Sequence, residues 1–88
     1  MKYIIRANSL VTKRYLTVDA AGVTFYESSF VGGKHRFSFR DVENVLMSSD
    51  NVLSFQVGKE VFSLPIKSTK TKHQATINAL IQGVGQRG

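Results

Sequence analysis

Basic side chains are the residues of this chain whose types and spacing could do chemistry. Five of them stand in or beside the turns expected between strands: Lys13, Arg14, Lys34, Arg36 and Lys59. Lysine and arginine at such positions can hold a phosphate group, arginine through two parallel N–H donors. The alternative is that these residues are solvated hairpin tips, where lysine also discourages pairing between sheet edges. The pattern indicates an anion-binding hypothesis.

A second basic group precedes the expected C-terminal helix and consists of Lys67, Lys70 and Lys72, with His73 beside them. Cations are unfavourable at a helix N-terminus. Either an external anion sits on the free backbone N–H groups, or the helix begins later and the lysines belong to a solvated loop. We favour the solvated loop, because the dipole term costs only about 0.3–1 kcal/mol.

Catalytic and metal chemistry have little support in the sequence. It has no cysteine, so thiolate ligands and disulfides are excluded. His35 and His73 are its two histidines, and surface positions are expected for both. The serines have no identifiable base, and no Gly-x-Ser-x-Gly elbow or phosphate-binding loop is present. We therefore expect no metal, no cofactor and no enzymatic activity.

Length and composition predict one compact domain over residues 1–88. The chain has 42% apolar residues, enough for one core, and a formal net charge of +6 from twelve Lys/Arg against six Asp/Glu. Such a surplus favours anionic partners, although it also simply keeps a small domain soluble. No apolar run exceeds three residues, and the start carries Lys2 and Arg6. We expect a soluble cytoplasmic protein, with peripheral membrane attachment as an option.

Apolar residues alternate with polar ones through most of the chain, which predicts seven antiparallel strands. Their expected positions are about 3–8, 15–18, 23–26, 36–40, 45–47, 53–57 and 62–66. A type I turn with a left-handed glycine is expected at 19–22, and a primed two-residue turn at 58–59. Phe30-Val31 is expected to fold back over the mouth of the barrel, with insertion into a lipid headgroup region or a partner's pocket as the alternative.

One amphipathic helix is expected over about 70–83. Its apolar stripe at i, i+3, i+4 and i+7 consists of Ile77, Leu80, Ile81 and Val84. Thr71 and Gln74 have the spacing of a capping box, with Ser68 and Thr69 as competing caps. Gly83 and Gly85 are expected to stop the helix in left-handed conformations, and residues 85–88 to fray.

This order of elements resembles the pleckstrin-homology superfold, in particular its small bacterial members, across residues 3–84. Segments 16–23 (LTVDAAGV) and 37–45 (FSFRDVENV) carry the resemblance. It implies an antiparallel barrel or sandwich capped by the helix. It also implies that the loops bearing Lys13, Arg14, Lys34, Arg36 and Lys59 gather at one open end, and that the basic group of Lys67, Lys70 and Lys72 lies elsewhere. Leu16 stands where lipid-binding members have a second, spaced arginine.

Three functions remain open, and the first is favoured. It is a non-enzymatic interaction module that assembles with itself or binds a protein partner, by strand addition at a sheet edge or in a groove beside the helix, flanked by Asn51, Ser54 and Gln56. The second is binding of anionic lipid or a phosphorylated ligand through the five basic loop residues. The third is nucleic-acid binding by a small basic barrel, with Tyr15 and Tyr26 as stacking residues.

Overall fold

Seven strands and one C-terminal helix follow one another in the computed structural model, which describes residues 2–8, 10–28, 33–67 and 69–86. The expected mainly β chain with a C-terminal helix is confirmed. The elements are β1 (Tyr3–Asn8), β2 (Lys13–Asp19), β3 (Gly22–Glu27), β4 (Lys34–Phe37), the 3₁₀ turn η1 (Phe39–Asp41), β5 (Val42–Met47), β6 (Val52–Val57), β7 (Glu60–Pro65) and α1 (Thr71–Gly85).

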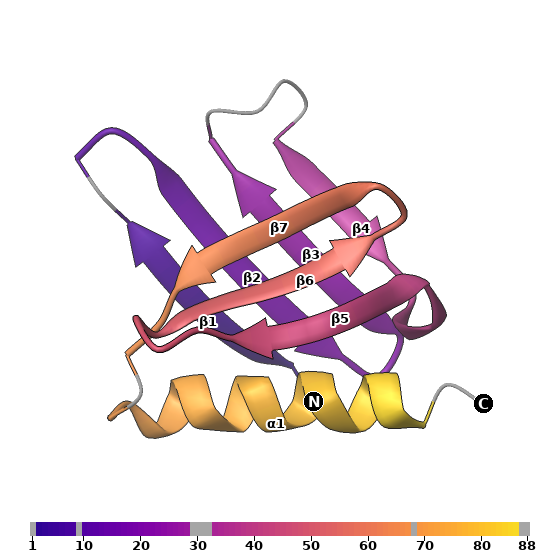
Figure 1. Cartoon of the computed structure of the whole chain (residues 1–88). Coiled ribbons are helices and arrows are strands. Elements are labelled where there is room, and N and C mark those ends of the chain that lie inside the picture. The colour runs from indigo at the N-terminus through magenta and orange to yellow at the C-terminus, as the bar shows by residue number, and fades with distance from the viewer. Residues whose placement is uncertain (1, 9, 29–32, 68, 87–88) are drawn as a thin grey trace.

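The strands form two antiparallel sheets. Sheet A has the order β1-β2-β3-β4 and sheet B the order β5-β6-β7. The sheets face each other with their strands crossing, and α1 lies along one side of the pair (Figure 1). They do not close into a barrel, so of the two expected architectures the sandwich is the right one.

Alternating residues of both sheets form the core between them. Leu16 and Phe25 of sheet A and Phe55 of sheet B are at most 1% exposed. The ring of Phe62 packs 5.2 Å from that of Phe25 and 5.5 Å from that of Phe55, centroid to centroid. Burial of each such side chain stabilises the fold by roughly 1.5–3 kcal/mol.

Two glycines shape the turns. Gly58 has a φ of 61°, and among the described residues Lys59 is not in a positive-φ conformation, so the β6–β7 turn is the primed type II′ turn that the sequence predicts. Gly22 has a φ of 155°, which is not the expected left-handed helical value. A Cβ at Gly22 would overlap the carbonyl oxygen of Phe37. Glycine is needed there because the end of β4 approaches the β2–β3 turn closely.

The middle of the chain departs from the predicted strands. The strand expected over 36–40 ends at Phe37, because Ser38 Oγ donates to Asp41 Oδ2 (2.9 Å) and the Asp41 N–H donates to the Ser38 carbonyl (3.1 Å). These local bonds close η1 and compete with the ladder. Strand β5 then begins three residues earlier than expected, at Val42, and contains a bulge where Asn44 has a φ of 51°.

The helix also differs from the predicted helix, both at its ends and in the residues that it buries. Its N-cap is Lys70 without a side-chain cap hydrogen bond, so the expected capping box does not form. It runs through Gly83 to Gly85, and neither glycine has a positive φ. The buried residues are His73, Thr76 and Leu80, whereas Ile81, expected in the apolar stripe, is 53% exposed. Ser68, the Phe30-Val31 pair and the last two residues lie outside the described residues.

Candidate functional site

The five basic residues expected at one end of the molecule do not gather. Lys13 and Arg14 are neighbours on β2, and successive side chains of a strand point to opposite faces of the sheet. Lys34 pairs with Tyr26, which pairs with Tyr15, so Lys34 shares the outer face of sheet A with Lys13. Arg14 alone of these three lies on the inner face.

Arg36 is held by an acidic partner at the other end of β2. Its Nη2 donates to Asp19 Oδ1 (2.8 Å) and its Nη1 donates to Asp19 Oδ2 (3.1 Å) and to Thr24 Oγ1 (2.8 Å). This hydrogen-bonded pair lowers the pKa of Asp19 to about 2, with further help from the backbone N–H groups of Ala21 and Gly22 and against the opposing effect of burial. Arg36 therefore stabilises the β2–β3 turn, and its charge is already compensated.

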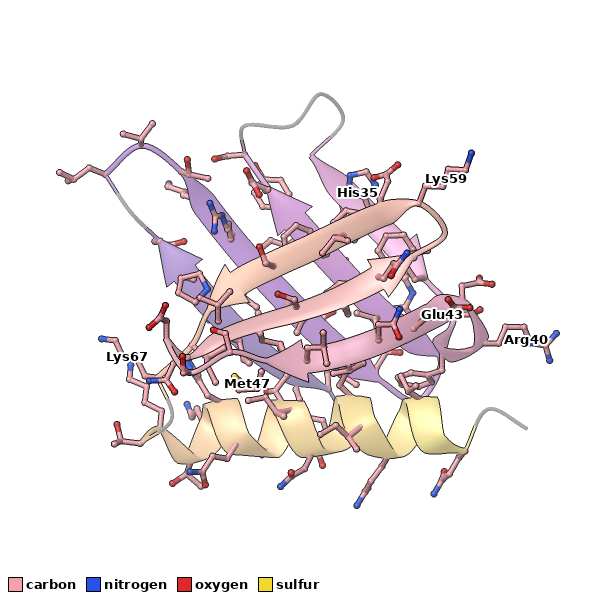
Figure 2. The ribbon with its side chains drawn as sticks, viewed as in Figure 1. His35, Arg40, Glu43, Met47, Lys59 and Lys67 are labelled. Atoms are coloured by element: carbon pink, nitrogen blue, oxygen red, sulfur yellow. The ribbon has the colours of Figure 1, made fainter. Side chains whose placement is uncertain are left out.

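Lys59 lies on the β6–β7 turn (Figure 2). His35 is half-buried, with its ring 5.4 Å from that of Phe62 and 6.0 Å from that of Phe37. The imidazole of His35 thus extends the aromatic core, and the surface role expected for it is wrong.

A different set of basic residues does come together, around a cavity of about 380 Å³. We call it the cationic cavity. It lies between the β1–β2 hairpin, the end of β7 and the start of α1, and Lys67 marks its position in Figure 2. Its lining residues are Arg6, Ala7, Asn8, Thr12, Arg14, Pro65, Ile66, Lys67, Lys70 and His73.

Four of the described residues that line the cationic cavity are cations, and none is an aspartate or glutamate. The nearest recorded carboxylate contact is that of Arg14, whose Nε lies 3.4 Å from Glu27 Oε2. That distance makes an ion pair, but the buried Nε makes no hydrogen bond. Arg6, Lys67 and Lys70 are exposed and make no salt bridge within the described residues. The cavity therefore carries a surplus of positive charge.

His73 forms part of the wall of the cationic cavity. It is 8% exposed, and its Nδ1 accepts a hydrogen bond from the backbone N–H of Lys67 (2.9 Å). Burial lowers the pKa of His73, and the charges of Lys70 and Lys67 lower it further. The accepted bond assigns the ring proton to Nε2, so the imidazole is neutral. The surface role expected for His73 is therefore wrong: its ring ties the β7–α1 connection to the helix.

The structure thus brings together a different combination of basic residues from the two groups that the sequence predicts. Arg14 of the first group joins Lys67 and Lys70 of the second, although the resemblance implied that the groups lie apart. Lys72 faces a separate hollow at the start of β1. Sequence reasoning missed Arg6, which it treated only as a strand residue. The available signal was a charged residue between the apolar residues Ile5 and Ala7 in the first strand.

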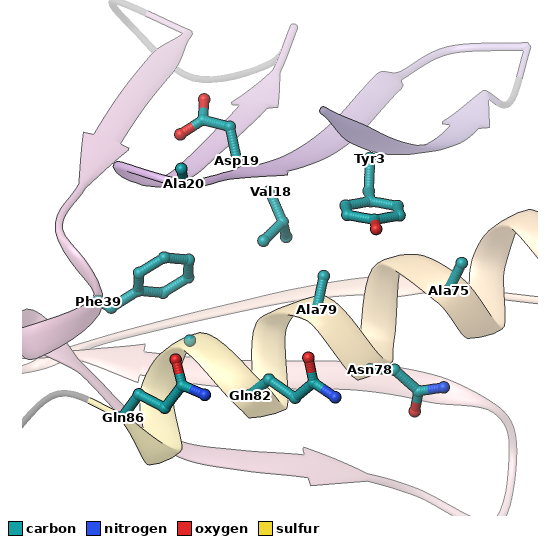
Figure 3. Close-up of a pocket in the computed structure, with 11 residues that line it drawn as sticks. Tyr3, Val18, Asp19, Ala20, Phe39, Ala75, Asn78, Ala79, Gln82 and Gln86 are labelled. Atoms are coloured by element: carbon teal, nitrogen blue, oxygen red, sulfur yellow. The ribbon is translucent and has the colours of Figure 1, made fainter. Parts of the chain in front are cut away.

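A larger groove of about 580 Å³ runs along the opposite flank of α1 (Figure 3). Small and apolar side chains form its floor, and Asn78, Gln82 and Gln86 stand at one-turn intervals along its helix side. Among its described lining residues Asp19 is the one charged group, and it is paired with Arg36. Ser54 and Gln56, expected to flank the helix groove, lie instead on β6, the central strand of sheet B.

Tyr15 and Tyr26, the expected stacking residues, lie side by side on the outer face of sheet A. Their rings stack with centroids 5.0 Å apart and an interplanar angle of 14°. Arg6 pairs with Tyr15 and Lys34 with Tyr26. One basic residue therefore flanks the tyrosine pair on each side, and each tyrosine already covers one face of the other.

Neither a metal site nor a similar known protein adds evidence about the function of this cavity or this groove. Within the described residues there is no group of three His, Cys, Asp or Glu side chains placed to hold a metal ion. In the part of the chain that the structure describes, no helix has both the length and the apolar character needed to cross a membrane. No protein-family model, curated protein or solved structure matches the chain.

Proposed function

We propose that this chain is a small, non-enzymatic pleckstrin-homology-like module that binds a phosphate-bearing anionic ligand in the cationic cavity. The order of seven strands and one helix supports the resemblance. The observation that carries the function is the convergence of Arg6, Arg14, Lys67 and Lys70 on one cavity without a lining carboxylate. Because like charges repel, such a cluster favours an anion among them.

The chemistry of the lining fits a compact anion. Arginine can donate two parallel N–H bonds to a phosphate, and lysine supplies a flexible point charge. A volume of about 380 Å³ lies in the usual range for small-molecule sites. His73 has its Nδ1 engaged by Lys67, so this arrangement favours binding over proton transfer.

A titration with inorganic pyrophosphate, followed by NMR amide shifts, tests the cavity. We expect Lys67→Gln with Lys70→Gln to weaken binding at least about tenfold, since each charge-assisted hydrogen bond contributes roughly 1.5–3 kcal/mol. The matched control is Lys13→Gln with Lys34→Gln, which removes the same charge from exposed positions on the outer face of sheet A. Equal losses in the two variants near physiological salt would reject the cavity as the binding site.

Binding of a protein partner is the second candidate function, carried by the groove along α1. Helix carboxamides at one-turn intervals stand about 6 Å apart, close to the two-residue repeat of an extended chain. Each carboxamide can donate to and accept from a peptide group. Strand addition is unfavourable at three of the four sheet edges, because β4 carries Lys34 and Arg36, β5 is bulged and β7 ends in Pro65.

The groove is tested with peptides selected from a random displayed library. We expect Gln82→Lys to abolish their binding, because it places a charge in the groove. Ile81→Lys puts the same charge on a residue that is 53% exposed and does not line the groove, and it should leave binding unchanged. Solution mass measured across salt concentrations tests self-assembly. A monomer under all conditions would reject the self-assembly form of this candidate.

A further inference from the structure

The connection between β1 and β2 carries two solvent-exposed apolar side chains, Leu10 and Val11. Leu10 is fully exposed and Val11 is 91% exposed, more than any other large apolar residue described. The connection projects beyond both sheets (Figure 1). Residues just before and after it, Asn8, Thr12 and Arg14, line the cationic cavity. The hairpin therefore carries an apolar tip and part of the cavity wall, including the cation Arg14, within seven residues.

We propose that this hairpin tip and the cationic cavity form one membrane-docking face, which takes the surface of an anionic bilayer. Headgroup phosphates occupy the cavity, and Leu10 and Val11 enter the boundary between headgroups and acyl chains. The inference rests on the proposed anion site and names the source of its ligand.

Dimensions and charge fit a bilayer surface. A strand rises 3.2–3.4 Å per residue, so the tip lies within roughly 7 Å of the lining residues Asn8 and Thr12, similar to the headgroup layer of about 5–8 Å on each side of a bilayer. The negative surface potential of an anionic leaflet extends over a Debye length of about 8 Å at physiological salt. The net charge of +6 steers the chain toward such a surface.

A bilayer accounts for more of the structure than a soluble phosphate does. A soluble anion would fill the cavity and leave Leu10 and Val11 in water, where exposed apolar surface is unfavourable. A bilayer supplies headgroup phosphates that neutralise the cations of the cavity, and the same contact covers the apolar side chains of Leu10 and Val11. Two weak signals together, one apolar and one basic, are also what stable attachment to a membrane surface requires.

Vesicle cosedimentation tests the inference, with phosphatidylcholine alone and with added phosphatidylglycerol. We expect the full chain to bind only the anionic vesicles, and Leu10→Ser with Val11→Ser to weaken that binding about tenfold or more. The matched control is Leu46→Ser with Val61→Ser. These residues are 64% and 67% exposed and lie on the outer face of sheet B, so their loss should leave vesicle binding unchanged.

The pyrophosphate titration separates this inference from the proposed function. Leu10→Ser with Val11→Ser should bind pyrophosphate as the unmodified chain does, because neither residue lines the cavity. Pyrophosphate binding without binding to anionic vesicles would overturn the membrane inference and leave the anion site standing. Vesicle binding that is indifferent to the tip substitution, or equally reduced by the control, would also overturn it. Loss of pyrophosphate binding by the tip variant would show that the tip serves the cavity rather than a bilayer.

Discussion

At the scale of single residues, Asp19 holds the β2–β3 turn through four accepted hydrogen bonds. It accepts two hydrogen bonds from Arg36 and two from the backbone N–H groups of Ala21 and Gly22. We predict that Asp19→Asn lowers the free energy of unfolding by about 1–2 kcal/mol at neutral pH, a value reduced for partial solvent exposure. Asp50→Asn, at an exposed turn position, should change it little. Urea unfolding measures both.

The same carboxylate gives a prediction for acid. Folding lowers the pKa of Asp19 from 3.8 to about 2, so the unfolded chain binds the proton more readily. The stabilisation is complete above pH 3.8 and is lost as the pH falls through that value toward 2. As the pH falls through this window, the free energies of unfolding of the unmodified chain and of Asp19→Asn should converge. A constant difference between them would contradict the assignment.

His73 acts in a higher pH window, with the same sign. Its pKa is lowered in the folded chain by burial first and then by Lys70 and Lys67, so protons bind preferentially to the unfolded chain below its ordinary value of 6.5. We predict that stability falls as the pH drops below 6.5, by at most about 1.4 kcal/mol per pH unit. His73→Asn keeps an acceptor for the Lys67 N–H and should flatten this slope. An unchanged slope would show that another group is responsible.

At the scale of elements, Gly83 decides how closely α1 approaches the β4–β5 connection. A Cβ at Gly83 would overlap the ring of Phe39, whereas one at Gly85 would meet nothing within 4 Å. We predict that Gly83→Ala destabilises the fold by about 1–3 kcal/mol through overpacking. Gly85→Ala, the matched control, should be neutral or stabilising by up to about 1 kcal/mol.

A double-mutant cycle tests the contact directly. In a Phe39→Ala background the space beside Gly83 opens, and Gly83→Ala should then cost little or even stabilise the helix. Thermal unfolding of the four variants gives the coupling energy. Additive effects would show that the ring of Phe39 does not limit the approach of the helix.

Sequence patterns predicted these elements where local chemistry dominates. The alternation of Leu16 and Val18 was sufficient to predict a strand, and the glycine of Gly58-Lys59 was sufficient to predict a tight turn. Each of these rules acts over only a few residues. The pattern failed for Phe39, whose alternation continues that of Phe37 although the Ser38–Asp41 hydrogen bonds bend the chain. It failed for Ile81 because the rotation of a helix about its axis is set by distant packing partners.

The candidate site was predictable only in part, for the same reason. Lys67 and Lys70 were identified as an unusual group, and Arg14 as a possible phosphate ligand. Their meeting in one cavity depends on how the end of β7 packs beside the β1–β2 hairpin, a contact between segments some 50 residues apart. No short-range pattern reports such a contact.

At the scale of the whole molecule, the positive charge is unevenly divided. The cationic cavity concentrates four cations at one end of the sandwich, whereas the groove along α1 has none among its described lining residues. Long-range attraction depends on the net charge, but direct contact depends on where the charge lies. Salt separates the two effects, because exposed charges farther apart than a Debye length are largely screened.

This division predicts how the two lysine double variants respond to salt. Lys67→Gln with Lys70→Gln and Lys13→Gln with Lys34→Gln each remove two positive charges, so both should weaken pyrophosphate binding at low ionic strength. Near physiological salt the Debye length is about 8 Å, and the effect of the Lys13 and Lys34 substitutions should vanish while that of Lys67 and Lys70 persists. Calorimetric titrations at the two ionic strengths measure the difference. If both effects vanish together, the anion is attracted by the net charge of +6 and not by the cavity.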